Sequence, residues 1–103
     1  MLTSKQRAYL KGLAMTMDPS VQVGKESMTP GVTDAVNEAL DAHELVKVGV
    51  LKNCADDPKE IAGVLADRTH AEVVQVIGKK IVLYRQAKRK EDRKIVLPKA
   101  NRA

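Results

Sequence analysis

The sequence predicts an α/β (α+β) two-layer sandwich, in which helices pack on a four-stranded mixed sheet. Three segments carry apolar residues at helical spacing, and four segments rich in valine or isoleucine have the pattern of strands. Their order is helix, strand, helix, strand, helix, strand, strand. Strand–helix–strand connections imply parallel pairing, and the last two strands, joined by a short loop, imply an antiparallel hairpin.

The first helix is predicted to begin at Thr3 or Ser4, because Thr3 and Gln6 have the spacing of a capping box. We expect it to end at Asp18, because a residue before proline is pushed out of the helical conformation. Its buried face is predicted from apolar residues at helical spacing, namely Leu10, Leu13, Ala14 and Met17.

Residues 20–23 alternate and are predicted to form a short strand, followed by a loop at residues 24–27. The second helix is predicted to begin with Thr29 as its N-cap and Pro30 in its first position. It should run to about His43. Its apolar stripe consists of Val32, Ala35, Val36, Ala39 and Leu40.

Residues 44–51 are predicted to form the second strand, with valines 46, 48 and 50 on one face. The third helix should begin with Asp57 as its N-cap, Pro58 in its first position and Glu60 reaching back to the cap. We expect it to end at about Arg68 and to be followed by a turn at residues 69–71. Its inward side chains are predicted to be Ile61, Val64 and Leu65.

Residues 72–77 and 81–85 are predicted to be the last two strands, joined by a loop at residues 78–80. Beyond residue 86 the pattern fails, except for the apolar residues 95–98. That short segment either docks on the domain or adds an edge strand.

The length of 103 residues fits one domain, which we place at residues 1–86, followed by a basic C-terminal tail at residues 87–103. Residues 1–85 contain 11 basic and 11 acidic residues, whereas residues 86–103 contain seven Lys or Arg and only two acidic residues. Such a tail is typical of an arm that binds a polyanion, although it can also be merely solubilising.

Catalysis is not expected from this sequence. His43 and His70 fall at predicted helix ends and Cys54 falls in a loop, so no nucleophile has an evident base beside it. One cysteine and two separated histidines do not supply a zinc site, and no phosphate-loop or dinucleotide fingerprint is present. We therefore predict a protein that is not an enzyme and that needs no cofactor and no metal.

The lone Cys54 cannot form an internal disulfide, which fits a reducing compartment. We expect no signal peptide, because no apolar run follows the first residues, and no membrane span, because no apolar run is long enough to cross a membrane. We expect a cytoplasmic protein that has no membrane partner and acts as a monomer.

Two loops are candidates for binding phosphate. Residues 24–27 lie before a helix N-terminus, where exposed amides accept anions, and Lys25 adds a charge, although Glu26 opposes it. Lys79 and Lys80 lie at the predicted hairpin tip. Each loop also has a plain structural interpretation, as a turn or as a charged tip that keeps the sheet end in solvent.

The small number of aromatic residues bears on the kind of RNA that would be recognised. The sequence has no Trp and no Phe, and its two tyrosines are Tyr9 and Tyr84. Domains that read single-stranded RNA stack bases on aromatic rings. Recognition of the backbone of a structured RNA is therefore the better match.

Four blocks of the sequence, at residues 2–14, 21–25, 39–48 and 74–85, resemble the chloroplast RNA splicing and ribosome maturation (CRM) domain, also called the YhbY-like domain. Residues 94–98 resemble the ending of that family. The resemblance implies a fold similar to the C-terminal domain of bacterial translation initiation factor 3. It also implies RNA binding and, for bacterial stand-alone members, association with precursors of the large ribosomal subunit.

Two departures from the family pattern stand out. The family often has a Gly-x-x-Gly loop after its first strand, and here Gly24 is retained but Ser27 replaces the second glycine. The family's Thr-Gly-Ala turn appears here with His70 in place of the glycine. We expect both substitutions to affect the local backbone geometry.

The predicted function is RNA binding on the precursor of the large subunit, with assistance to ribosome assembly through phosphate contacts from basic loops. The expected partner is large-subunit ribosomal RNA or its precursor particle. The alternative is a protein–protein adaptor that docks on a ribosomal protein. The predicted RNA-binding residues are Lys5, Arg7, Lys11, Gly24, Lys25, Ser27, Gly78, Lys79, Lys80 and Arg85.

Overall fold

Every predicted helix and strand is present in the structure, a computed structural model that describes residues 2–99. The order of the elements confirms the prediction. They are α1 (Ser4–Ala14), β1 (Val21–Val23), α2 (Pro30–His43), β2 (Leu45–Val50), α3 (Pro58–Thr69), β3 (Glu72–Ile77), β4 (Lys80–Tyr84) and a short 3₁₀ turn (Lys90–Asp92).

The strands form one four-stranded mixed sheet in the order β1-β2-β4-β3. β1 and β2 are parallel, with Val23 opposite Val50, whereas β4 is antiparallel to both of its neighbours. A register shift between Val73 and Gln75 interrupts the pairing of β3 with β4. The predicted mixed sheet is therefore confirmed.

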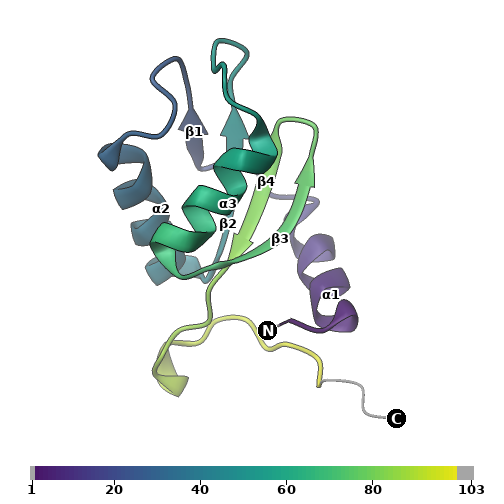
Figure 1. Cartoon of the computed structure of the whole chain (residues 1–103). Helices are drawn as coiled ribbons and strands as arrows, with labels where there is room; N and C mark the ends of the chain where they lie inside the picture. The colour runs from purple at the N-terminus through teal and green to yellow at the C-terminus, as the bar shows by residue number, and fades with distance from the viewer. Residues whose placement is uncertain (1, 100–103) are drawn as a thin grey trace.

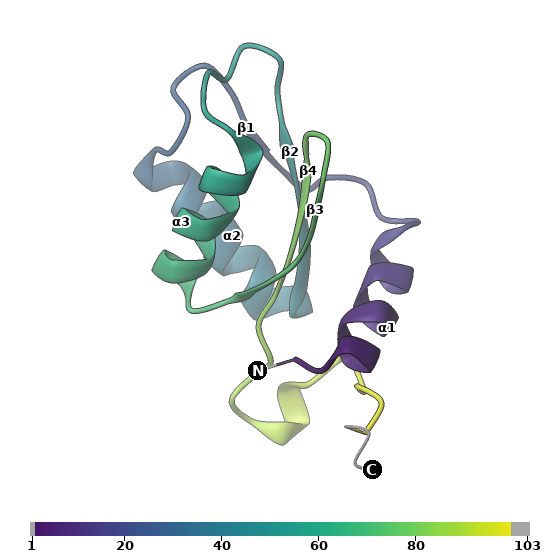
Figure 2. The same ribbon diagram turned by 45° about the vertical axis from the view of Figure 1, so that its right-hand side comes forward.

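Helices α2 and α3 cover one face of the sheet and form the two predicted layers with it (Figure 1). The aliphatic core between them is built from side chains such as Val36, Leu40, Leu65 and Ile81. Helix α1 lies on the opposite face and covers part of it (Figure 2). There Leu10 and its neighbours pack in a second, smaller core.

The helix starts follow the local sequence. The Thr3 hydroxyl accepts from the N–H of Gln6, and the Gln6 side chain accepts from the N–H of Thr3, both at 3.1 Å, which confirms the capping box. Thr29 accepts from the N–H of Val32 at the start of α2. At α3, however, the Asp57 carboxylate accepts from the N–H of Lys59, in place of the reciprocal pairing expected with residue 60.

Helix α1 ends at Ala14, four residues before the predicted end. The Nζ of Lys47, on β2, donates to the carbonyl oxygens of Ala14 and Met17 at 3.1 and 3.0 Å. Because the side chain of a distant strand satisfies these carbonyls, the helix stops before the proline is reached. The lysine comes from another part of the chain, so no local pattern predicts this end.

The prediction that a side chain faces inward is wrong at two positions. Leu13 and Val64 are each 38% exposed. Only part of α1 rests on the sheet, so its buried stripe is narrow and contains Leu10 and Ala14. On α3 the buried positions include Ile61, Ala62 and Leu65, which moves the stripe away from residue 64.

Several strand boundaries differ by a residue from the prediction. β2 begins at Leu45 because Glu44 caps α2 in a left-handed conformation with φ of 65°. β4 spans Lys80–Tyr84, which leaves a two-residue hairpin loop in which Gly78 has φ of 56°. A positive φ of this kind is adopted most easily by glycine.

The C-terminal segment, residues 86–99, crosses below the sheet and returns towards α1 (Figure 1). Ile95 and Leu97 pack against the core beneath α1, and the segment forms no strand within the described residues. Docking is therefore confirmed over the edge-strand alternative. The basic residue Arg102 lies outside the described residues. No helix in residues 2–99 is long and apolar enough to cross a membrane.

Candidate nucleic-acid interface

The two candidate phosphate-binding loops meet at one end of the sheet, on either side of the end of β2 (Figure 1). The N–H of Leu51 donates to the carbonyl of Val23, directly before the first loop, at 2.8 Å. The N–H of Val50 donates to the carbonyl of Lys79, in the hairpin loop, at 2.7 Å. Six of the predicted RNA-binding residues therefore lie at this end: Gly24, Lys25, Ser27, Gly78, Lys79 and Lys80.

The loop of residues 24–27 is closed by a hydrogen bond of 2.9 Å from the N–H of Ser27 to the carbonyl of Gly24. Ser27 has φ of 55°, the left-handed region that favours glycine, so the backbone keeps the geometry expected of the family's second glycine. Its hydroxyl donates to the Asp56 carboxylate, in the loop that follows β2. Ser27 thus adopts a left-handed turn and adds a side-chain link to the next loop.

The loop between β2 and α3, residues 51–57, forms a third part of this end and was missed by the sequence analysis. Leu51 and Asn53 lie within 3.6 and 3.7 Å of the position that a Cβ on Gly24 would occupy. A signal for it existed, because loops that follow two neighbouring parallel strands leave the sheet at the same end. We call residues 24–27, 51–57 and 78–80 together the loop end.

The loop end carries both signs of charge. Its four lysines are Lys25, Lys52, Lys79 and Lys80, all exposed and without an ion pair among the described residues. Its acidic residues are Glu26, Asp56 and Asp57. The Nζ of Lys80 lies 3.6 Å from the Cβ position of Gly49, so this side chain extends across β2. Four mobile ammonium groups can contact phosphates, while the carboxylates limit the net attraction.

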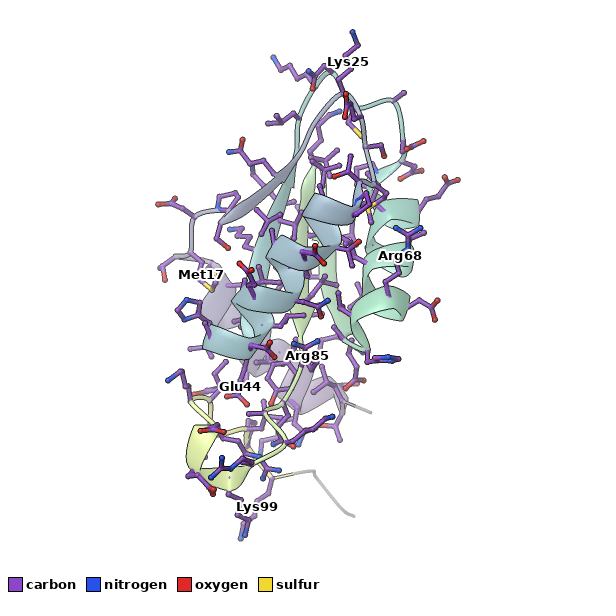
Figure 3. The ribbon with its side chains drawn as sticks, turned by 90° about the vertical axis from the view of Figure 1, so that its left-hand side faces the viewer. Met17, Lys25, Glu44, Arg68, Arg85 and Lys99 are labelled. Atoms are coloured by element: carbon purple, nitrogen blue, oxygen red, sulfur yellow. The ribbon has the colours of Figure 1, made fainter. Side chains whose placement is uncertain are left out.

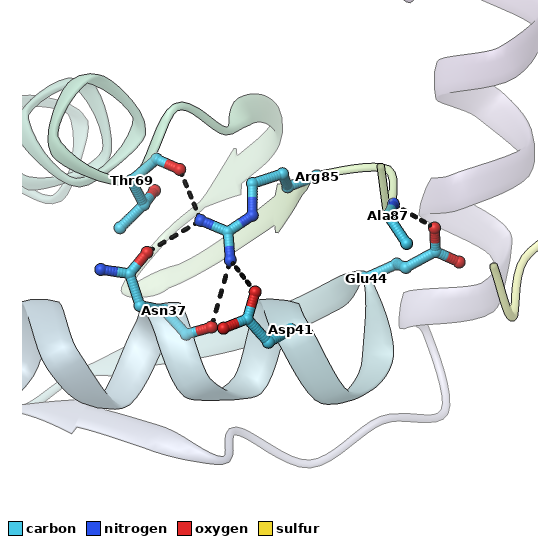
Figure 4. Close-up of polar contacts among 6 residues, drawn as sticks. All are labelled: Asn37, Asp41, Glu44, Thr69, Arg85 and Ala87. Atoms are coloured by element: carbon cyan, nitrogen blue, oxygen red, sulfur yellow. Dashed lines mark hydrogen bonds and ion pairs between the residues drawn. The ribbon is translucent and has the colours of Figure 1, made fainter. Parts of the chain in front are cut away.

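Arg85 lies away from the loop end and is engaged within the protein (Figure 4). Its Nη1 donates to Asn37 Oδ1 and to the carbonyl of Thr69, at 2.8 and 2.7 Å. Its Nη2 donates to the carbonyl of Asn37 and pairs with Asp41, at 3.2 and 2.7 Å. The guanidinium therefore ties α2 and the end of α3 to the end of β4.

The basic residues of α1 are also separate from the loop end. Lys5 and Lys11 are exposed and Arg7 is half-buried on a helix that lies across the sheet from α2 and α3 (Figure 2). The Nε2 of Gln6 donates to the carbonyl of Pro98 at 3.0 Å. The structure therefore brings the start of α1 to the C-terminal segment instead of to the two loops.

Glu44 holds the C-terminal segment in place. Its side chain is buried, and its carboxylate accepts from the N–H groups of Ala87, Lys94 and Ile95 at 2.7, 2.6 and 2.8 Å. Burial raises the pKa of Glu44, but these three donors and the nearby Arg93 charge outweigh burial and leave the pKa below its ordinary value. The buried carboxylate is therefore ionised, and it binds both ends of the stretch from Ala87 to Ile95.

The sequence contained one weak signal for the role of Glu44. A carboxylate at the C-terminal end of a helix interacts unfavourably with the helix dipole, so an acidic residue there indicates a hydrogen-bond donor or a positive charge nearby. That donor is backbone more than forty residues later, which no local pattern identifies.

The tyrosines differ in their access to a base. Tyr84 is buried, and burial together with the Glu44 charge raises its pKa. Tyr9 is 42% exposed on α1. Of the two tyrosines, Tyr9 is thus the one that a base could reach. Within residues 2–99, no group of three His, Cys, Asp or Glu side chains is placed to hold a metal ion.

Comparisons with known proteins agree with one another. The sequence model of the CRS1 / YhbY (CRM) domain matches residues 2–85. "Probable RNA-binding protein YqeI" of Bacillus subtilis is 41% identical over 98 residues, which cover 95% of this chain and 100% of the relative. "RNA-binding protein" of Haemophilus influenzae is 39% identical over 98 residues, covering 95% and 96%.

A solved structure is also similar. The solution structure of the hypothetical protein SAV1595 from Staphylococcus aureus matches this chain with a TM-score of 0.77 and 43% sequence identity. The match covers 95% of this chain and 100% of that protein. The similarity therefore extends over the fold and the C-terminal segment together.

Proposed function

Since the chain belongs to the CRS1 / YhbY (CRM) domain family, we propose that it is an RNA-binding protein that associates with precursors of the large ribosomal subunit and assists their assembly. RNA binding is supported by the names of two relatives that match almost the whole chain. The ribosomal role is supported by the resemblance to bacterial stand-alone members of the family. Binding rather than catalysis is the proposed activity.

The observation that carries the proposal is the meeting of three loops at the end of β2. Four exposed lysines, one from each of the three loops and Lys80 from the start of β4, lie at one end of the molecule, beside the Gly-x-x-Gly-like turn. Lysine is a point charge that contacts phosphate without reading base identity. Lys25, Lys79 and Lys80 are therefore proposed to contact the RNA backbone, with the amides near Gly24 close to a phosphate.

The adaptor alternative is favoured by one observation, the charge of the layer formed by α2 and α3. Its exposed acidic residues are Asp34, Glu38, Asp41, Glu60 and Asp67, against Lys59 and Arg68. A basic ribosomal protein would complement this layer. The two proposals use different faces of the molecule, so one experiment can distinguish them.

The test is sedimentation of a cell lysate through a sucrose gradient, followed by detection of the protein in each fraction at low and at moderate salt. Phosphate contacts release counterions, so we expect the protein with large-subunit precursors at low salt and its loss as salt rises. Recovery only at the top of the gradient at both salt concentrations overturns the ribosomal role. Retention of a stoichiometric protein partner after nuclease treatment favours the adaptor.

Variants make the test specific to the loop end. K25Q/K79Q removes two positive charges there, and R68E on α3 changes the net charge by the same amount at a site outside the loops. We expect K25Q/K79Q to leave the precursor fractions at lower salt than the wild type, while R68E behaves like the wild type. Equal behaviour of the two variants would remove the loop end from the proposed function.

A further inference from the structure

We propose that the chain has a second RNA-binding surface, at the end of the molecule opposite the loop end, and that it holds two RNA segments at once. The second surface consists of the C-terminal segment, residues 86–99, and the first turn of α1. The inference rests on the proposed function, because it takes RNA as the polyanion. It adds a separate site and predicts the number of RNA segments bound to each chain.

The charge of the C-terminal segment is the first observation. Its six exposed cationic side chains are Lys88, Arg89, Lys90, Arg93, Lys94 and Lys99. Only Glu91 and Asp92 oppose them, and among the described residues only Arg89 of the six forms an ion pair. This surface is thus more strongly positive than the loop end, where three acidic residues face four lysines.

The second observation is that the backbone that carries these charges is held against the domain. Three backbone N–H groups of the segment bind the buried Glu44 carboxylate, and the Nε of Arg93 donates to the carbonyl of Ala87 at 3.0 Å. Ile95 and Leu97 pack against the core beneath α1. Because the segment is already ordered, binding to a phosphate backbone need not order it again.

The start of α1 adds to the same surface. The hydrogen bond between Gln6 and the carbonyl of Pro98 joins the two elements, and Lys5 is exposed in the first turn of the helix. No acidic residue occurs within α1. The first turn of α1 and the end of the C-terminal segment, more than eighty positions apart in the sequence, therefore lie side by side.

The two surfaces are too far apart to act on one short stretch of RNA. Glu44 precedes the first residue of β2 and the loop end follows its last residue, so the strand separates them. The molecule is 44 Å long, and Lys25 and Lys99 lie at its opposite ends (Figure 3). Charges in solution are screened over roughly 8 Å at physiological salt, so the two surfaces attract RNA independently.

The experiment counts RNA molecules bound to the full chain, by native mass spectrometry and sedimentation velocity, with RNA in excess at about 0.15 M salt, where the two surfaces are screened from each other. One duplex of about 10 base pairs and one of about 30 are compared, because a double-stranded-RNA-binding domain spans roughly 16. We expect two duplexes per chain with either length. Two short duplexes but one long duplex would mean that a single RNA runs along the molecule, which overturns the inference.

Variants assign each bound duplex to a surface. K88Q/K94Q on the C-terminal segment and K25Q/K79Q at the loop end should each reduce the stoichiometry from two to one. R68E, which removes the same net charge, should leave it at two. Circular dichroism confirms that each variant is folded.

Failure of the second surface is distinguishable from failure of the proposed function. One duplex per wild-type chain, lost in K25Q/K79Q and unchanged in K88Q/K94Q, overturns the second surface and leaves RNA binding by the loops intact. Two duplexes on K88Q/K94Q also overturns it. No duplex bound by the wild type overturns the proposed function, and the second surface with it.

Discussion

The Glu44 carboxylate accepts a hydrogen bond from the N–H of Ala87, 43 residues later in the chain (Figure 4). The same side chain binds the N–H groups of Lys94 and Ile95, and the carbonyl of Glu44 accepts from the N–H of Arg85. One residue at the junction of α2 and β2 therefore determines where the chain goes after β4. Glu44 is one of three non-glycine residues with positive φ in the described chain.

Replacing Glu44 with alanine is expected to release the C-terminal segment. Three N–H groups would lose their acceptor, and each unpaired buried donor costs about 1–3 kcal/mol, so the segment should leave the surface and become hydrated. Limited proteolysis should then cleave E44A after the lysines and arginines of residues 88–94 much faster than the wild type. The control is E38Q, an exposed position on the same helix; equal cleavage of E44A and wild type would contradict the role assigned to Glu44.

The stability provided by Glu44 should depend on pH. Its pKa is lowered on folding, so its ionised form contributes fully above its ordinary value of 4.5, and the contribution disappears as pH falls through the lower, folded pKa. Urea unfolding of the wild type and of E44Q is to be compared from neutral pH downward. The difference in unfolding free energy should be constant above about pH 5 and should shrink below 4.5. A difference that grows on acidification would contradict the predicted sign.

The elements of this fold were predictable because their signals are local. The caps at Thr3 and Thr29, the prolines that open α2 and α3, and the valine alternation of β2 all lie within the elements that they define. The early end of α1 depends on Lys47, more than thirty residues away, and lay beyond local reasoning. The contacts of Arg85 with α2 and α3 and the role of Glu44 were missed for the same reason, because their partners are distant in the sequence.

The candidate site was predictable in part. Each loop was identified from its glycine and lysines, but their meeting depends on the parallel pairing of β1 with β2 and on the hydrogen bond between Val50 and Lys79. Where the family pattern has glycine, Ser27 and His70 both adopt a left-handed backbone. The surrounding fold thus determines the backbone conformation at these two positions. The residue type changes only the free-energy cost of adopting that conformation. The assignment of RNA contacts to individual residues stays a prediction.

Replacing His70 with glycine should stabilise the protein by about 0.5–1 kcal/mol. His70 caps α3 with φ of 56°, a conformation that costs a residue with a Cβ about 1–2 kcal/mol. Glycine avoids this cost, but part of the stabilisation is lost because glycine has more conformational freedom in the unfolded chain. The urea midpoint of H70G should rise, and that of H70A should not. An H70G variant less stable than the wild type would show that the exposed imidazole makes a contribution larger than the backbone cost.

Replacing Asp56 with asparagine should strengthen RNA binding by about twofold to threefold at low salt, because one carboxylate beside the proposed phosphate site loses its charge. The asparagine oxygen can still accept from the Ser27 hydroxyl, so the loop should keep its shape. Fluorescence anisotropy with a labelled RNA duplex measures the affinity. D67N, on the exposed side of α3, removes the same charge away from the loops and should have little effect; equal gains for both variants would indicate a general charge effect.

Arg85 should prove essential for stability rather than for direct RNA contact. R85Q removes the ion pair with Asp41 and leaves the carbonyls of Asn37 and Thr69 without their charged donor, so we expect a loss of about 2–3 kcal/mol in unfolding free energy. R85K keeps the charge but lacks the planar fork that reaches four acceptors, so it should recover only part of the loss. Below its unfolding temperature, R85Q should bind RNA with nearly wild-type affinity and an unchanged salt dependence. If the slope of log affinity against log salt falls by about one in R85Q while the protein is folded, then Arg85 contacts a phosphate directly and this assignment is wrong.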